Sequence, residues 1–167
     1  MANSIDSDFN VFSEYISVDY KTGKIFWKAQ PSTQIKVGDE AGSDDRYGYR
    51  KLCFRKRMFL VHRVVFLLAN GRWPIGQIDH INGNRKDNRI ENLREATHSL
   101  NMQNQRKAMS SNHSSGLLGV TLHKNGKWQA LIKTNGKSRY IGLFPTPEEA
   151  HAAYILAKRE LHDGCTI

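Results

Sequence analysis

The fold of this chain is decided by one stretch, Gln77 to Asn101, which reads QIDHINGNRKDNRIENLREATHSLN. The stretch opens with an acid beside a histidine, Asp79-His80, just after a short apolar run. A polar loop rich in Asn and Arg follows, and Asn92 comes before the final Asn101. An Asp, a His and two Asn side chains brought together in space could hold a hard divalent cation beside a general base. We therefore expect this stretch to carry the chemistry of the chain.

The charge of the chain favours a polyanionic partner. The 167 residues carry a net charge of +9, and basic charge attracts polyanions by steering and by counterion release. Residues 1–75 hold 12 basic and 8 acidic side chains, residues 76–113 hold 6 and 4, and residues 114–167 hold 7 and 4. The excess is spread along the chain, which fits a long footprint on nucleic acid better than a single basic arm. A merely basic protein is the plainer alternative.

The composition argues against two other classes of protein. No apolar run approaches the roughly 20 residues that span a bilayer, and the polar N-terminal residues show no signal peptide. We therefore expect an intracellular protein with no membrane partner. Cys53 and Cys165 stand far apart, so a zinc site built on four thiolates is excluded. Cys53 lies in an apolar run and is predicted to be a small core residue.

The chain before the central stretch predicts an α+β fold that begins with β-hairpins. The first 20 residues favour a short helix or strand. Predicted strands span residues 25–27, 47–54 and 58–61, and a predicted helix spans residues 62–69. The connection Arg55-Lys56-Arg57 gives the second hairpin a basic tip. A phosphate contact there is at least as strongly expected as plain solvated charge.

The chain after the central stretch predicts a small sheet backed by one helix. A polar helix runs to Lys107, and residues 108–116 have the composition of a linker. Strands are predicted at 119–123, 128–133 and 139–144, joined by two Asn-Gly turns. Thr146-Pro147-Glu148-Glu149 then opens a helix with an apolar stripe that can cover one sheet face. The other face would carry Thr121, His123, Leu131, Lys133 and Tyr140.

The residues of the central stretch also have plain structural interpretations. Adjacent residues of a strand point to opposite sides, so Asp79 and His80 share one site only where the strand twists or ends. Asn82-Gly83-Asn84 is ordinary turn chemistry. Asn92 could bond only to the loop backbone, and Asn101 could face solvent on a helix. Singly, each plain role is favoured, whereas the order and spacing together, in a basic chain, favour a catalytic site.

A wider pattern surrounds this stretch. Its residues are His62-Arg63 before an apolar helix, Asp79-His80-Ile81-Asn82-Gly83-Asn84, Asp87-Asn88-Arg89, Asn92-Leu93-Arg94, Ala96-Thr97 and Asn101. With this pattern, residues 62–104 resemble the HNH endonucleases, in particular the free-standing or intron-encoded homing endonucleases of phages. Residues 15–61, with Tyr20-Lys21-Thr22-Gly23, are similar to the part that usually precedes the pattern. His62 itself is interpreted as a packed structural residue.

The resemblance implies a ββα-metal fold of two strands, a loop and a helix around one divalent ion. His80 would be the general base that activates water, and Asn92 would hold the loop that positions it. Asp79 and Asn101 would ligate Mg²⁺ or Mn²⁺. Many members have His where Asn101 stands, and the amide oxygen suits these cations better than Zn²⁺. Phosphate contacts are expected from Arg85, Lys86 and Arg94 and from the basic hairpin tip.

The C-terminal part carries a second pattern, with Gly119-Val120, Gly126-Lys127-Trp128, Ala130, Tyr140-Ile141-Gly142-Leu143-Phe144 and Glu148-Glu149-Ala150. With it, residues 116–162 resemble the ethylene-response-factor (Apetala-two type) DNA-binding domain. The resemblance implies that the sheet enters the major groove, with Thr121, His123, Lys133 and Tyr140 at the DNA. Thr121, His123 and Asn125 stand at three of the positions where the plant domains place Arg and Trp, so the DNA sequence read must differ.

Together these patterns predict an HNH nuclease domain at 1–107 (a β-rich part at 1–74 and a ββα-metal core at 75–107), a linker at 108–116 and a DNA-binding domain at 117–167. The expected function is site-specific hydrolysis of double-stranded DNA, in the manner of a homing endonuclease, by a monomer or weak dimer. The expected location is the cytoplasm, of a bacterial host cell if the gene is carried by a phage. A DNA-binding transcriptional regulator without catalysis is the alternative. An RNA-binding protein is a third possibility, for which no stacking platform is evident.

Overall fold

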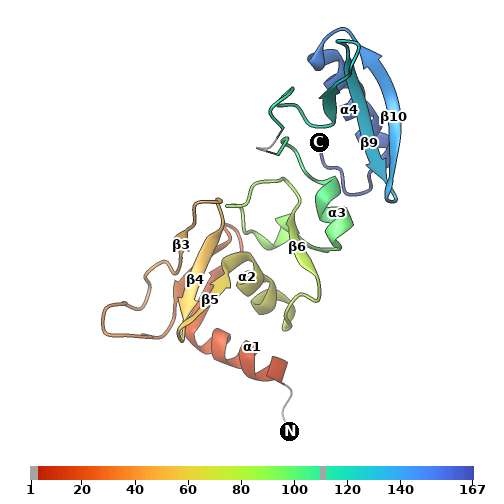
Figure 1. Ribbon diagram of the computed structural model, residues 1–167. Helices are drawn as coiled ribbons and strands as arrows, with labels where there is room; N and C mark the ends of the chain where they lie inside the picture. Colours follow the sequence, from red (N-terminus) through yellow and green to blue (C-terminus); the bar gives the residue numbers. More distant parts are fainter. Residues whose placement is uncertain (1–3, 110–111) are drawn as a thin grey trace. The chain divides into compact units, whose positions relative to one another are not determined.

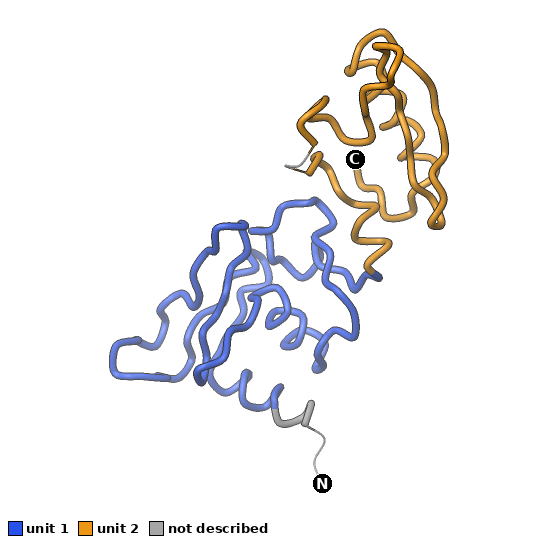
Figure 2. Tube along the Cα trace, in the orientation of Figure 1, with its two compact units in different colours: residues 1–97 blue, residues 98–167 orange. Residues whose placement is uncertain are grey.

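The computed structural model describes residues 4–109 and 112–167. It divides into two compact units, Met1–Thr97 and His98–Ile167 (Figure 2). The predicted domains grouped residues 98–107 with the nuclease part, whereas this segment packs within the second unit. There the Gln103 side chain accepts a bond from Gly164 N at 3.0 Å, and Lys158 donates to the Gln105 carbonyl. A polar segment with little apolar face gives no sequence signal for the unit it joins.

The first unit begins with a helix and a hairpin (Figure 1). The helix is α1 (Ser4–Tyr15), and the hairpin pairs β1 (Ile16–Asp19) with β2 (Lys24–Trp27). Gly23 closes the hairpin turn at φ +71°, a conformation that suits glycine. The first 20 residues thus contain both of the elements that the sequence left open.

A three-stranded sheet and a helix follow. The sheet has the order β3-β4-β5, with β3 (Ser43–Asp44), β4 (Arg50–Phe54) and β5 (Arg57–Leu60), and α2 (Val61–Asn70) follows directly and packs on β4 and β5. The predicted basic hairpin is therefore present. Its turn is only two residues long, because Arg57 already belongs to β5. Gly71 ends α2 in the left-handed conformation, as its Asn-Gly signal predicts.

The core of the first unit joins these elements. Buried side chains from α1, β1, β2, β4 and α2 form one cluster that includes Phe12, Ile16, Ile25, Trp27, Leu52, Phe54, Val64, Val65 and Leu67. The prediction that Cys53 is a core residue is wrong, because Cys53 is exposed. Leu52 and Phe54 on either side of it are buried, so strand alternation turns Cys53 outward.

The central stretch forms a third hairpin. Strand β6 (Gln77–His80) pairs antiparallel with β7 (Leu93–Ala96), with Asp79 opposite Arg94, and a short 3₁₀ turn η1 (Ile90–Asn92) precedes β7. Helix α3 (His98–Gln103) follows, shorter than the predicted helix that ran to Lys107. The order strand, loop, strand, helix agrees with the order expected from the sequence.

The second unit contains the predicted three strands and helix. The sheet order is β10-β9-β8, formed by β8 (Val120–Leu122), β9 (Trp128–Thr134) and β10 (Lys137–Phe144), and α4 (Pro147–Leu161) packs on it. The Thr146 hydroxyl caps α4 by accepting a bond from Glu149 N at 3.3 Å. One buried residue departs from the apolar stripe, since Lys158 is only 1% exposed.

Within the described ranges, none of the helices combines the length and the apolar character needed to cross a membrane.

Candidate active site

Asp79 and His80 end strand β6, and both are buried at 4% and 5% exposure. Their side chains have different partners. The Asp79 carboxylate accepts from Arg94, its cross-strand neighbour, through Nε at 2.9 Å and Nη2 at 2.8 Å. The His80 ring lies with Nε2 at 3.1 Å from the Asn88 amide oxygen. The carboxylate of Asp79 and the imidazole of His80 thus have separate surroundings, as the alternation of side chains along a strand requires.

The His80 ring packs among other rings. The His62 ring meets it edge to face with centroids 5.0 Å apart, and the Tyr49 ring lies 6.2 Å away. The Arg85 guanidinium covers Tyr49 at 4.8 Å from the ring centroid. Burial lowers the pKa of His80 below its ordinary value, and it lowers the pKa of His62 to about 3. Both imidazoles are therefore neutral near pH 7.

Asn92 closes the loop that follows His80. Its amide oxygen accepts from the backbone N–H of Asn82 at 2.9 Å, and its amide nitrogen donates to the carbonyl of Asp87 at 2.8 Å. Its own carbonyl accepts from Ile81 N at 2.9 Å. Asn92 is 5% exposed, so one buried side chain joins the beginning, middle and end of the loop.

The far side of the loop is held by Asp87. Arg89 donates to both of its carboxylate oxygens, through Nε at 2.8 Å and Nη2 at 2.7 Å, and the Asn82 amide adds a third bond at 2.7 Å. These hydrogen bonds lower the pKa of Asp87 to about 2, and the bonds from the Arg89 side chain have the largest effect. Asn88 lies between two residues that are fixed in this way.

The segment that leads into β6 is fixed by two arginines. Arg63 on α2 donates to the carbonyls of Gly76 at 3.0 Å and Pro74 at 3.1 Å. Arg72 forms a two-bond pair with Glu95 on β7, at 3.1 and 2.6 Å. The neighbouring residues His62 and Arg63 thus have separate tasks, because one packs against the His80 ring and the other holds the chain that brings His80 into position.

The donor chemistry at Asp79 fits a hard cation. Its carboxylate oxygens are the ligands that Mg²⁺ and Mn²⁺ prefer. Residues 4–109 and 112–167 contain no group of three or more His, Cys, Asp or Glu side chains placed so that it could hold a metal ion. A site with few protein ligands suits Mg²⁺, which commonly keeps several waters and binds substrate phosphates, and it does not suit structural Zn²⁺. Asn101 lies on α3, in the second unit, and its role as a ligand stays a prediction.

The basic residues predicted to contact DNA differ in their surroundings. Arg55-Lys56-Arg57 is exposed at the hairpin tip. Lys86 is also exposed and forms an ion pair with Asp44 at 3.0 Å. Arg94 instead forms the pair with Asp79 described above, with 26% of its side chain exposed. The hairpin tip and Lys86 therefore offer accessible positive charge, whereas the Arg94 guanidinium is engaged by Asp79.

The second unit presents the predicted open sheet face. Tyr140 pairs with Leu131 across the two long strands, Lys133 lies two residues further along β9, and Thr121 lies on β8. Thr121, Lys133 and Tyr140 are exposed, and His123 is half-buried in the turn after β8. The two strand residues on either side of Leu131 are buried against α4, so alternation turns this set away from the helix.

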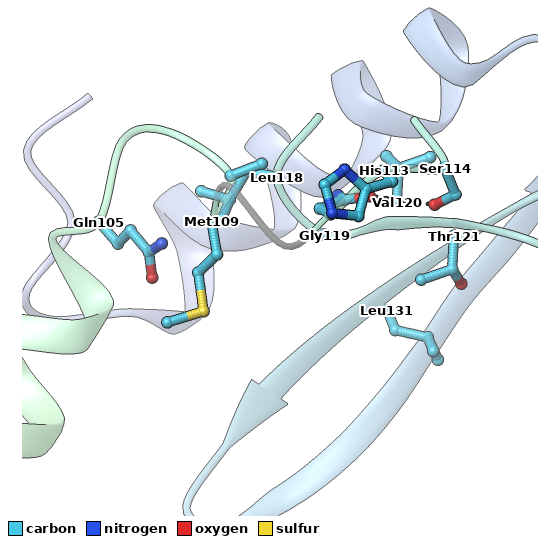
Figure 3. A pocket seen from close by; sticks show the side chains of 11 residues that line it. Gln105, Met109, His113, Ser114, Leu118, Gly119, Val120, Thr121 and Leu131 are labelled. Carbon is cyan, nitrogen blue, oxygen red and sulfur yellow. Dashed lines mark hydrogen bonds between the residues drawn. The ribbon is translucent and has the colours of Figure 1, made fainter. Parts of the chain in front are cut away.

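A cavity of about 680 Å³ lies in the second unit. The close-up in Figure 3 shows Thr121 and Leu131 from the sheet, Met109 and Leu118 from the loops, and the Gln105 amide around it. Its lining includes no carboxylate and one histidine, so it lacks an acid and base pair. The candidate catalytic residues on β6 are not part of its lining.

Sequence reasoning did not assign three supporting residues of the site. Asn88 and Arg63 stand inside the pattern that carries the resemblance, and Glu95 lies next to Arg94 in it. For His62, the position at the start of an apolar helix was the sequence signal that its ring is packed. The partners of these side chains are far away in sequence, so no local spacing identifies them.

Comparison with curated proteins and with solved structures gives no match. Residues 59–103 match the family model described as HNH endonuclease. The matched range begins in β5 and ends with α3, and it includes α2, the paired strands β6 and β7 and the loop closed by Asn92. This part of the chain is therefore similar to the HNH endonucleases, and the similarity indicates nuclease activity on DNA.

Proposed function

We propose that the protein is a DNA endonuclease that hydrolyses phosphodiester bonds with one divalent cation and with His80 as general base. The observation that carries the proposal is the position of His80. His80 follows Asp79 at the end of β6, and the loop behind it is closed by Asn92. A fixed imidazole next in sequence to a carboxylate that can bind a hard cation supplies the two groups that metal-assisted phosphodiester hydrolysis uses.

The chain's own residues would act as follows. His80 accepts a proton from water as the water oxygen attacks phosphorus, and the bond from phosphorus to the departing 3′ oxygen breaks. That oxygen takes a proton from solvent. Asp79 would hold the cation, as would Asn101 according to its sequence pattern. When bound, the cation supplies charge stabilisation at the phosphate and at the departing oxygen. Arg94 orients the Asp79 carboxylate through two bonds to one oxygen.

DNA binding in this proposal uses both units. The exposed tip Arg55-Lys56-Arg57, together with Arg85 and Lys86, would contact phosphates, which gives affinity without sequence preference. The open face of the β8–β10 sheet, with Thr121, His123, Lys133 and Tyr140, would contact bases. The support is the exposure of Thr121, Lys133 and Tyr140 on this face. We propose on this basis that the second unit makes cleavage site-specific.

The test uses supercoiled plasmid DNA, which reveals a single nick without knowledge of the target sequence. Wild type, His80→Ala and Asp79→Asn are incubated with Mg²⁺, with Mn²⁺ and with EDTA. We expect metal-dependent relaxation by wild type only, with DNA binding retained in both variants. If wild type binds DNA and cleaves with neither cation, the nuclease proposal fails and a DNA-binding regulator replaces it. If His80→Ala cleaves as fast as wild type, His80 is not the base.

A further inference from the structure

The contact between His80 and Asn88 has a chemical consequence beyond packing. A neutral imidazole carries one N–H and one lone pair, and the partner of one nitrogen decides which nitrogen is which. The nitrogen Nε2 faces an amide oxygen at 3.1 Å, and an oxygen accepts but does not donate. Nε2 is therefore the donor, and the lone pair belongs to Nδ1.

We infer that Asn88 is a positioning residue that fixes His80 in the Nε2–H form and so presents Nδ1 as the basic atom. This inference rests on the proposed function, in which His80 takes a proton from water. Asn88 is 3% exposed and His80 5% exposed, so solvent competes little for their bond. A buried bond of this kind sets the tautomer and the orientation of a catalytic imidazole together.

The backbone at Asn88 is held from behind by a distant turn. A Cβ at residue 23 would overlap the carbonyl carbon of Asn88, so the turn touches the loop at that point. The turn is itself firm, since Gly23 N donates to the Asp19 carbonyl at 2.8 Å and the Thr22 hydroxyl donates to the Asp19 carboxylate at 2.7 Å. The hairpin of β1 and β2 thus supports the loop residue that orients the base.

The ring of His80 is also confined on its face. The His62 ring meets it edge to face at 5.0 Å and restricts rotation of the ring. Asn88 determines which nitrogen donates, and His62 determines the plane in which the ring lies. The amide oxygen of Asn88 is the group that faces Nε2, so Asn88 is the residue to test.

The experiment reads the tautomer directly on metal-free protein. Ring nitrogens are labelled with ¹⁵N, long-range proton–nitrogen spectra are recorded, and the His80 signals are assigned by their loss in His80→Gln. Wild type should show one Nε2–H pattern. Asn88→Leu, which removes the acceptor at similar volume, should show a mixed or exchange-averaged pattern. Asn88→Asp keeps an oxygen acceptor and should restore the wild-type pattern.

Activity and a matched control complete the test. The single-turnover cleavage rate of Asn88→Leu should fall about 10- to 100-fold with DNA affinity unchanged, and Asn88→Asp should recover most of it. The control Asn84→Ala removes a different bond of the same loop, to Lys86 N at 3.1 Å, and should leave the His80 pattern intact. An Nδ1–H pattern in wild type, or a wild-type pattern in Asn88→Leu, overturns the inference. If the pattern changes but no protein cleaves DNA, the proposed function fails while the tautomer assignment stands.

Discussion

Replacing Asn92 by alanine removes the two side-chain bonds that close the loop after His80. Each such bond contributes about 1 kcal/mol net, and a backbone group left without any partner costs about 1–3 kcal/mol. Asn82 is exposed and Asp87 half-buried, so water reaches both groups and the lower figure applies to each. We therefore expect Asn92→Ala to lower the free energy of unfolding of the first unit by about 2 kcal/mol, with a fall in Tm of roughly 10 °C or more.

Native-state hydrogen exchange measures this loss in the first unit separately from the second. The core amides of α2 report the global opening of the unit, and their exchange should accelerate in Asn92→Ala. The amide of Asn82, which bonds Asn92 directly, should lose protection further. Asn10→Ala is the matched control, because Asn10 is exposed on α1 and should change stability by no more than about 0.5 kcal/mol. Equal exchange in the two variants, or an Asn82 amide that stays protected, would refute the closure of the loop by Asn92.

Backbone strain and charge give three more tests. Gly23→Ala should destabilise by about 2 kcal/mol or more, because the added Cβ overlaps loop backbone. Gly48→Ala, also at positive φ but with nothing within 4 Å, should lose only about 1 kcal/mol, and equal losses in urea titrations would argue against the overlap. Arg55 and Lys56 hold φ of +49° and +63°, so replacing them by Asn and Gly should raise Tm. The same change should weaken DNA binding and reduce the slope of log affinity against log salt concentration by the equivalent of about two phosphate contacts. Unchanged binding at every salt concentration would exclude the tip as a phosphate contact. Asp87→Asn should destabilise by about 1 kcal/mol at pH 7. The folded pKa of Asp87 of about 2 lies below its unfolded value of about 3.9. The stabilisation by Asp87 is therefore present above pH 4 and disappears as pH falls through 2. A stability difference between wild type and Asp87→Asn that persists below pH 2 would contradict this reasoning.

The elements that could be predicted from the sequence carry their signals locally. Thr146 and Pro147 mark the start of α4, and the two Asn-Gly pairs mark the turns between the strands of the second sheet. Gly71 marks the end of α2 in the same way. Each signal depends on the backbone conformation that one residue favours or on one capping bond, so neighbours within a few positions are sufficient.

The features that the sequence could not give depend on distant partners. The ring of His62 packs on His80, and the turn at Gly23 touches Asn88, but no spacing rule connects these positions. Cys53 was predicted to be buried because its neighbours are apolar, and the register of β4 turned it outward. Which residues face inward is decided by tertiary packing, which local patterns do not encode.

The role of His80 is the central claim, and a single-turnover cleavage rate tests it most directly. Protein in excess over DNA, with affinity measured in parallel, separates the chemical step from binding. Loss of a general base lowers the rate about 10²- to 10⁴-fold, so His80→Ala should cleave at that reduced rate while it binds DNA and unfolds like wild type. A His80→Ala protein that cleaves within a few fold of wild type would contradict the account.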